Sequence, residues 1–266
     1  MEAIDSAIPR PVKHVIKQVL PISPIYRAVQ WFTADKPSVV EVRRGALTGR
    51  RFRCNLKYER WYWLGAYEVE LERLLLQWLQ PGDVFYDVGT HKGYFSLIAA
   101  TKVGANGMVI GFEPNPSNVA ESLTNFRLNP DLSPRIQLHA VAAVDVSGLV
   151  RFAGRAHQST GRVVPGSSAA GTYVVNGISL DDFLGQGHPA PTIIKMDIEG
   201  GERWALRGMV DVLRRHRPLV AVEIHDGLAF DAARSVAEQC DYALEGPSSA
   251  SSNAWTTRAR YILRPK

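Results

Sequence analysis

Charged side chains stand at the ends of four short apolar runs in this sequence. Asp87, Glu113 and Asp197 end three of these runs, and Glu223 and His225 end the fourth. The carboxyl ends of parallel strands meet at one edge of an α/β sheet, so these side chains are expected to gather there. Carboxylates accept hydrogen bonds from ammonium and hydroxyl groups, and an imidazole exchanges a proton near neutral pH. We therefore expect a site for a polar ligand.

The first run leads into a glycine turn. Val84–Val88 is typical of a buried parallel strand, Gly89 and Gly93 enclose Thr90-His91-Lys92, and an apolar helical pattern begins at Tyr94. Such a turn places backbone N–H groups around a ligand. A dinucleotide-binding turn reads G-x-G-x-x-G, and this turn lacks the middle glycine that lets the backbone approach a pyrophosphate. A ligand with an amino-acid end and a nucleoside end, such as S-adenosylmethionine, fits better. A β–α turn without a ligand is the alternative.

A second acidic residue follows the next predicted strand. Glu113 comes directly after Val109–Phe112. A carboxylate at this place can accept hydrogen bonds from both hydroxyls of a ribose. The alternative is a helix cap in front of Pro116. The distance of about 26 residues between this acid and the first motif favours the ribose role.

The third and fourth motifs place further charge at the same predicted edge. Lys195, Asp197 and Glu199 alternate, so they share a face while the strand lasts. Glu223 and His225 alternate in the same way on the following strand. If the two strands are neighbours, Lys195 is expected to pair with Glu223, and His225 to lie near Asp197.

From residue 84 the pattern alternates between strands and helices, which predicts a doubly wound, mostly parallel α/β sheet. The expected strands are 84–88, 109–112, 136–143, 192–197, 218–224, 241–244 and 257–263. The expected helices are 67–79, 94–103, 116–128, 200–215 and 229–238. Glu202 is interpreted as a charge in the first turn of its helix. Short strands at 149–152 and 173–175 flank a polar loop at 155–171, and a second loop covers 246–253.

The first 60 residues form a basic N-terminal extension, with twelve Lys/Arg against five Asp/Glu. Residues 10–20 show the spacing of an amphipathic helix, a second short helix is expected after Pro24, and a β-hairpin is expected from 39–43 and 52–56. We divide the chain into this extension (1–60) and a domain at 61–266. A solvated basic face is the first interpretation, and a surface for nucleic acid, an acidic membrane or an anionic substrate is the alternative. Packing of the first helix on the body is the default, and a membrane or a second subunit of a homodimer is the alternative.

The composition is that of an ordinary globular protein. The chain of 266 residues has 45% hydrophobic residues, enough for a sizeable core. Two cysteines are too few for a disulfide framework. There is no apolar run of about 18 residues and no apolar core of a signal peptide. We expect a cytoplasmic protein.

Taken together, the motifs resemble the FkbM family of S-adenosylmethionine-dependent methyltransferases. The likeness runs from about Trp63 to His225, and no single motif in it is decisive. The matching segments are Tyr67-Glu68, Pro81-Gly82-Asp83, Asp87-Val-Gly-x-x-x-Gly-Tyr, Phe112-Glu113-Pro, Ser179-Leu-Asp-Asp-Phe, Lys195-x-Asp-x-Glu-Gly and Glu223-Ile-His. The family's first turn more often reads D-V-G-A-N-x-G, so Thr90-His91 stands here in place of Ala-Asn.

The resemblance implies a fold and a cofactor. The fold would be the seven-stranded, Rossmann-like sheet of class I methyltransferases. The cofactor would be S-adenosylmethionine, with Asp87 addressing the methionyl ammonium, Glu113 the ribose and Ala142 the adenine. The full set of implied cofactor contacts is Asp87, Gly89, His91, Gly93, Tyr94, Glu113, Asn115, Ala142 and Asp197.

The resemblance also implies methyl transfer to a hydroxyl of a sugar or another small polar metabolite. Such a transfer is an in-line displacement, and the alcohol must lose its proton. Asp197 and His225 are the candidate bases, and we favour His225 as a neutral imidazole. Lys195, Glu199 and Glu223 are expected to support them. No metal is expected, and the alternative is a divalent cation on Asp197, Glu199 and Glu223.

Two other functions compete with this interpretation. An RNA 2′-hydroxyl methyltransferase would share the fold and use the basic extension. The Asp/Asn-Pro-Pro-aromatic and Pro-Cys signatures of other nucleic-acid methyltransferases are absent, which disfavours nucleic acid as the partner. A catalytically silent binding or scaffold protein is the second alternative, and the acids at four strand ends argue against it.

Overall fold

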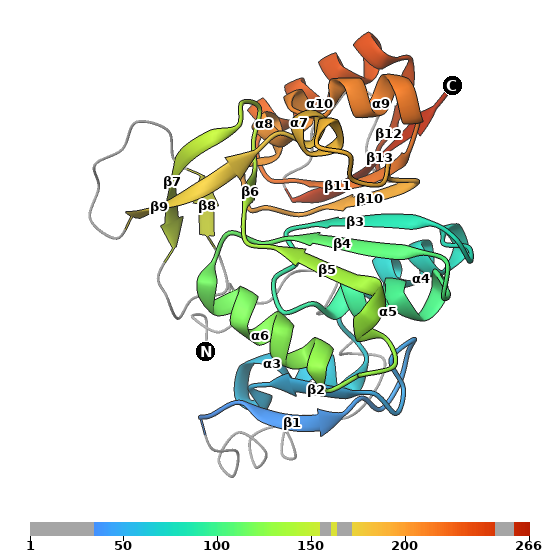
Figure 1. The fold of residues 1–266 in the computed structure, drawn as a ribbon, viewed down its shortest axis with the longest axis vertical. Helices are drawn as coiled ribbons and strands as arrows, with labels where there is room; N and C mark the ends of the chain where they lie inside the picture. The colour runs from blue at the N-terminus through green and yellow to red at the C-terminus, as the bar shows by residue number, and fades with distance from the viewer. Residues whose placement is uncertain (1–34, 155–160, 164–171, 248–257) are drawn as a thin grey trace.

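The computed structural model describes residues 35–154, 161–163, 172–247 and 258–266. Within these ranges a seven-stranded sheet runs through the molecule in the order β12-β13-β11-β10-β3-β4-β5 (Figure 1). Its strands are β3 (Val84–Val88), β4 (Met108–Phe112), β5 (Ile136–His139), β10 (Ile193–Met196), β11 (Leu219–Ile224), β12 (Tyr242–Glu245) and β13 (Ala259–Pro265). The strands from β5 to β11 pair in parallel, and β13 is antiparallel to both of its neighbours. The prediction of a doubly wound, mostly parallel seven-stranded sheet is confirmed.

Helices cover both faces of this sheet because its central strands are apolar on both sides. In β3, Tyr86 and Val88 enter one core and Phe85 enters the other. The first core is closed by α7 (Leu180–Gly185), α8 (Glu202–Arg207), α9 (Val210–His216) and α10 (Gly227–Cys240). The second is closed by α4 (Val69–Trp78), α5 (Tyr94–Lys102) and α6 (Pro116–Arg127). Asp87 continues the alternation of Phe85 and therefore lies on the α5 face.

The predicted hairpin is present as β1 (Ser38–Glu41) and β2 (Arg51–Cys54), which pair antiparallel. Phe52 of β2 is fully buried in the second core, so the hairpin is packed onto the main domain. An additional helix that the sequence analysis did not predict, α3 (Leu56–Leu64), follows it. Asn55 caps its start by accepting a hydrogen bond from the N–H of Lys57. The division of the chain at residue 60 stays a prediction.

A second, four-stranded sheet projects from the edge near β5. Its order is β6 (Ala142–Ala143), β9 (Thr172–Ile178), β7 (Gly148–Gly154) and β8 (Gly161–Val163). The predicted strand 136–143 is therefore wrong as a single element. The N–H of Val141 donates to the carbonyl of His139, and this tight turn ends β5 before β6 begins in the other sheet.

The predicted helix 200–215 is also two elements. It breaks at Gly208, where α8 ends and α9 follows. A Cβ at Gly208 would lie 2.0 Å from the carbonyl oxygen of Val144, so the backbone of the second sheet passes directly against this point. The helix α7 was not predicted, and the side chain of Ser179 caps it.

Several predicted segments fall outside the part of the chain that the structure describes. These are the helix at 10–20, the helix after Pro24, and most of the loops at 155–171 and 246–253. Among the described helices, none has the length and apolar character needed to cross a bilayer. Cys54 and Cys240 are buried free thiols. The cytoplasmic location stays a prediction.

We expect Gly89 to be required for the close approach between the turn after β3 and the backbone after β10. Its φ is +84°, and a Cβ there would lie 1.9 Å from the carbonyl oxygen of Asp197. Gly82 is a matched control, since its φ is +95° but no atom lies within 4 Å of such a Cβ. Gly82→Ala should lower the free energy of unfolding by about 1–2 kcal/mol, the cost of the left-handed backbone alone. Gly89→Ala should lower it by about 3 kcal/mol or more. Equal losses in urea denaturation would contradict the close approach.

Candidate functional site

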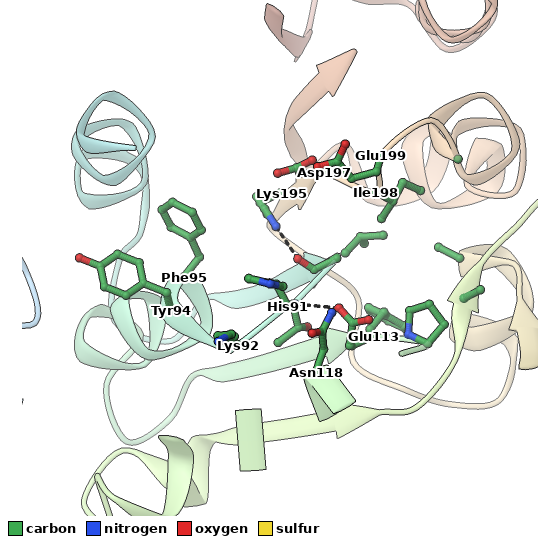
Figure 2. A pocket seen from close by; sticks show the side chains of 18 of the residues that line it. His91, Lys92, Tyr94, Phe95, Glu113, Asn118, Lys195, Asp197, Ile198 and Glu199 are labelled. Atoms are coloured by element: carbon green, nitrogen blue, oxygen red, sulfur yellow. Dashed lines mark hydrogen bonds between the residues drawn. The ribbon is translucent and has the colours of Figure 1, made fainter. Parts of the chain in front are cut away.

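A pocket opens at the carboxyl edge of the main sheet, between β3 and β10 (Figure 2). The strand order reverses at this point, because the chain leaves β3 toward β4 on one side and later returns to β10 on the other. Crevices of this kind are where open α/β sheets bind ligands. The predicted site residues that line it are Gly89, His91, Tyr94, Glu113, Ala142, Lys195, Asp197 and Glu199. Asp87, Gly93, Asn115, Glu223 and His225 lie behind or beside this lining.

Asp87 and Lys195 form a buried ion pair across β3 and β10. The two residues are register partners, and Nζ of Lys195 lies 3.1 Å from Oδ1 of Asp87. Nζ also donates to the carbonyl of Gly89 at 2.7 Å, and Ser96 Oγ donates to Asp87 Oδ2 at 2.6 Å. Burial works against the charged form of Lys195, but the negative charges of Asp87, Asp197 and Glu68 together outweigh it and raise the pKa of Lys195. The pair thereby holds the first glycine of the turn in place.

The predicted pairing of Lys195 with Glu223 is wrong. The sheet places β10 between β3 and β11, and Lys195 turns to the acid on β3. Glu223 lies 3.6 Å from the guanidinium of Arg260 on β13 instead. The alternation of residues along β10 predicts the face of the sheet on which Lys195 lies. It does not predict which neighbouring strand supplies the partner.

Glu113 stands at the end of β4 with its carboxylate held by backbone groups. Oε2 accepts a hydrogen bond from the N–H of His91 at 2.8 Å (Figure 2). Oε1 accepts one from the N–H of Asn115 at 2.9 Å. Burial raises the pKa of Glu113 to about 7, although these hydrogen bonds oppose the shift. A carboxylate has about four acceptor positions, so it retains capacity for hydroxyl groups. Asn115 itself caps α6 with its side chain, and the helix begins with Pro116 as expected.

His91 occupies the glycine turn with a left-handed backbone, at φ +53°. Its Nδ1 lies 3.2 Å from the hydroxyl of Tyr62, and its buried Nε2 has no hydrogen-bond partner among the described residues. Burial, with the positive charge of Lys92, lowers the pKa of His91 to about 4. The ring at the pocket is therefore neutral at physiological pH.

Aromatic side chains pack against the glycine turn. Tyr94 contacts the rings of Tyr62, Tyr67 and Phe95 at centroid distances of 5.1–5.8 Å. Figure 2 shows the phenol of Tyr94 directed away from Glu113, so its ring supports the turn from the α5 side. Ala142 and Ala143 of β6 complete the lining with small apolar side chains.

His225 is enclosed by carboxylates at the ends of β10 and β11. Its Nδ1 lies 2.8 Å from Oε1 of the fully buried Glu202. Its Nε2 lies 3.4 Å from Glu199 Oε2, 3.7 Å from Asp197 Oδ1 and 3.9 Å from Glu223 Oε1. The expected proximity of His225 and Asp197 is confirmed.

The expected neutral state of His225 is wrong. Burial lowers the pKa of this imidazole, but the surrounding carboxylates, Glu202 foremost, outweigh burial and raise it to about 9. The ring is therefore a cation at neutral pH. Burial and the neighbouring carboxylates also raise the pKa of Glu223 to about 7. The site is crowded with negative charge.

Three residues of this region were not identified as site residues from the sequence. Glu68 and Arg260 form an ion pair, and both lie close to Glu223. They are 192 positions apart, and the motif Tyr67-Glu68 was the only signal for either. Glu202 does bind backbone N–H groups at the start of α8, namely those of Ile198 and Gly200, but it also holds His225.

Two overlapping groups have the geometry to hold a metal ion: Asp197, Glu199 and His225, and Glu68, Asp197 and Glu223.

Comparison with known proteins identifies the family. Residues 87–244 match the methyltransferase FkbM domain. Hexuronic acid methyltransferase AglP from Haloferax volcanii is 33% identical over 165 residues, which is 60% of this chain and 64% of that protein. This chain therefore spans somewhat less than two thirds of that relative. It belongs to the FkbM methyltransferase family, whose members generally depend on S-adenosylmethionine.

Two solved structures with a partial similarity to this chain were also found. A methyltransferase FkbM from Methylobacillus flagellatus aligns with a TM-score of 0.49 at 20% identity, covering 68% of this chain and 43% of that one. A putative rRNA methylase from Clostridium thermocellum aligns with a TM-score of 0.48 at 11% identity, covering 74% and 95%.

We expect Lys195→Met to destabilise the protein strongly, because it leaves the charge of Asp87 buried without its partner. The free energy of unfolding should fall by about 3–5 kcal/mol. Adding Asp87→Asn should recover part of this loss, since the double variant no longer buries an uncompensated charge. Lys57→Met is the control, because Lys57 pairs with Asp35 at the surface, where solvent screens the charges, and this substitution should leave the free energy of unfolding nearly unchanged. Additive losses of the two core substitutions in urea denaturation would contradict a coupled pair.

We expect His91 to make the stability of the protein sensitive to mild acid. In the folded protein its pKa of about 4 lies below the ordinary histidine value of about 6.5, so below pH 6.5 the unfolded chain binds a proton that the folded chain does not. The effect of His91 on the free energy of unfolding should be absent above pH 6.5, and it should lower that free energy by up to about 3 kcal/mol as the pH drops toward 4. His91→Asn should remove this part of the slope, and substitution of the exposed His216 by Asn should not. Equal slopes for wild type and His91→Asn between pH 7 and 4.5 would show that His91 is not the group responsible.

Proposed function

We propose that this protein is an S-adenosylmethionine-dependent O-methyltransferase acting on a hydroxyl of a sugar or another small polar metabolite. The observation that carries the proposal is a single pocket with Glu113 at the end of β4 and Asp197 after β10, on either side of the glycine turn. Membership of the FkbM family supports it. The relative from Haloferax volcanii, a hexuronic acid methyltransferase by name, supports a sugar as the class of acceptor.

In this proposal the cofactor lies along the turn. The carboxylate of Glu113 accepts hydrogen bonds from the ribose hydroxyls, because its oxygens are presented to the pocket by two backbone N–H groups. The backbone at Gly89 takes the amino-acid end, and Ala142 borders the adenine. Asp87 acts through Lys195, which fixes the carbonyl of Gly89. The direct contact of Asp87 with the methionyl ammonium, which the family resemblance implies, stays a prediction.

The protein has two tasks in the transfer itself. The acceptor oxygen forms a bond to the methyl carbon as the bond from carbon to sulfur breaks, so the three atoms must be held in line. The hydroxyl proton must also go to a base. We assign this base to the carboxylate of Asp197, whose Oδ1 is buried and has no hydrogen-bond partner in the described part of the chain. His225, a cation here, offsets part of the negative charge beside it.

The test of the proposal is cofactor binding by Glu113 variants. Glu113→Gln should weaken the binding of S-adenosylmethionine and of its demethylated product about tenfold to a hundredfold, because a charge-assisted pair of hydrogen bonds is lost. Asp131→Asn, which changes an exposed carboxylate paired with Arg50, should leave the affinity unchanged. Isothermal titration calorimetry measures both affinities, and thermal unfolding checks that the variants fold.

Two results would overturn the proposal. If the wild-type protein binds neither compound, it is a non-enzymatic member of the fold. If it binds them but mass spectrometry shows the gain of one methyl group on RNA and on no sugar, the acceptor class is wrong.

A further inference from the structure

We propose that Asp197, Glu199 and His225 form a binding site for a divalent transition-metal cation such as Mn²⁺. The three residues come from the end of β10 and the end of β11, and their ligand atoms all lie within 4.8 Å of one another. The site adjoins the pocket described above, through Asp197 and Glu199. The argument for it does not use the cofactor, but a bound cation would occupy the Asp197 carboxylate proposed above as the base, so that role of Asp197 applies to the metal-free protein.

The distances suit a bridging cation better than direct hydrogen bonds. Nε2 of His225 lies 3.4 Å from Glu199 Oε2 and 3.7 Å from Asp197 Oδ1, longer than ordinary N–H···O hydrogen bonds of about 2.7–3.2 Å. A cation with ligands at roughly 2.0–2.3 Å keeps neighbouring ligands about 3 Å apart and opposite ones about 4–4.6 Å apart. Both observed distances fall between these limits.

His225 is held in the orientation of a metal ligand. Its side chain is only 9% exposed, and its Nδ1 is bound by Oε1 of Glu202 at 2.8 Å. Glu202 is fully buried and is fixed by the N–H groups of Ile198 and Gly200. A buried carboxylate on one ring nitrogen directs the other nitrogen outward, and metal-binding histidines are commonly supported in this way. Here the outward nitrogen faces Asp197 and Glu199.

The local charge also favours a cation at this point. Within the described residues, the carboxylates around this point are Glu68, Asp197, Glu199, Glu202 and Glu223. The positive groups among them are Arg260, which is divided between Glu68 and Glu223, and His225, with the exposed Arg258 acting on Glu199. Lys195 is already engaged by Asp87. Oδ1 of Asp197 is buried without a hydrogen-bond partner in the described chain, although it lies between these groups.

The donor set selects the class of metal. One imidazole nitrogen with two carboxylates is a mixed nitrogen and oxygen set, which suits Mn²⁺, Fe²⁺ or Zn²⁺, whereas Mg²⁺ and Ca²⁺ prefer oxygen alone.

The test is Mn²⁺ binding to the full-length protein after treatment with a chelator. Electron paramagnetic resonance counts free Mn²⁺ during a titration, and electron spin echo detects a coordinated imidazole nitrogen. Wild type should bind one Mn²⁺ with an imidazole nitrogen in its signal, and Mg²⁺ should compete at least about tenfold more weakly. Glu199→Gln and His225→Gln should each weaken Mn²⁺ binding at least about tenfold. Asp231→Asn, at an exposed carboxylate paired with Arg234 on α10, should leave it unchanged.

Three results would overturn the site. These are no Mn²⁺ binding by wild type, binding without an imidazole nitrogen signal, and binding that survives Glu199→Gln. Glu199 is partly exposed and does not hold the core, so this variant remains informative if His225→Gln fails to fold. Cofactor affinity, measured separately, distinguishes failure of this site from failure of the proposed function.

Discussion

The buried ion pair of Asp87 and Lys195 is the interaction on which the rest of the site depends. It joins the two central strands at the point where the strand order reverses, and its lysine also binds the carbonyl of Gly89. Two charges at 0% and 5% exposure are tolerated in an apolar sheet only because each satisfies the other. The glycine turn, the helix α5 and the loop after Lys195 are thereby fixed to one another before any ligand arrives.

The two edges of the pocket then acquire opposite electrostatic characters. On the side of β4, Glu113 is held by backbone N–H groups and His91 is neutral, so this part offers acceptors in a well-ordered, weakly charged setting. On the side of β11, carboxylates outnumber cations, and His225 carries a proton. The first environment suits hydroxyl groups of a bound nucleoside, and the second suits proton transfer or a metal ion.

The sequence predicted the parts whose signal is local. The strands β3, β4, β10 and β11 are short apolar runs that are followed or ended by charged side chains. The hairpin shows the alternation of polar and apolar residues, and the start of α6 shows a capping residue in front of a proline. What it missed depends on long-range contacts. Gly208 ends a helix because Val144 lies against it, and the partner of Lys195 follows from strand order rather than from spacing. Glu68 and Arg260 meet from distant segments, and the charge on His225 results from carboxylates on two strands and a helix.

A crystal structure with S-adenosylhomocysteine, the demethylated cofactor, would show whether this pocket holds the cofactor as proposed. We expect both ribose hydroxyls within hydrogen-bond distance of Glu113, the amino-acid end along the turn at Gly89, and the sulfur facing Asp197. The pair of Asp87 and Lys195 should remain closed beneath it. A cofactor bound elsewhere, or one whose ribose avoids Glu113 while the pair opens, would contradict the account.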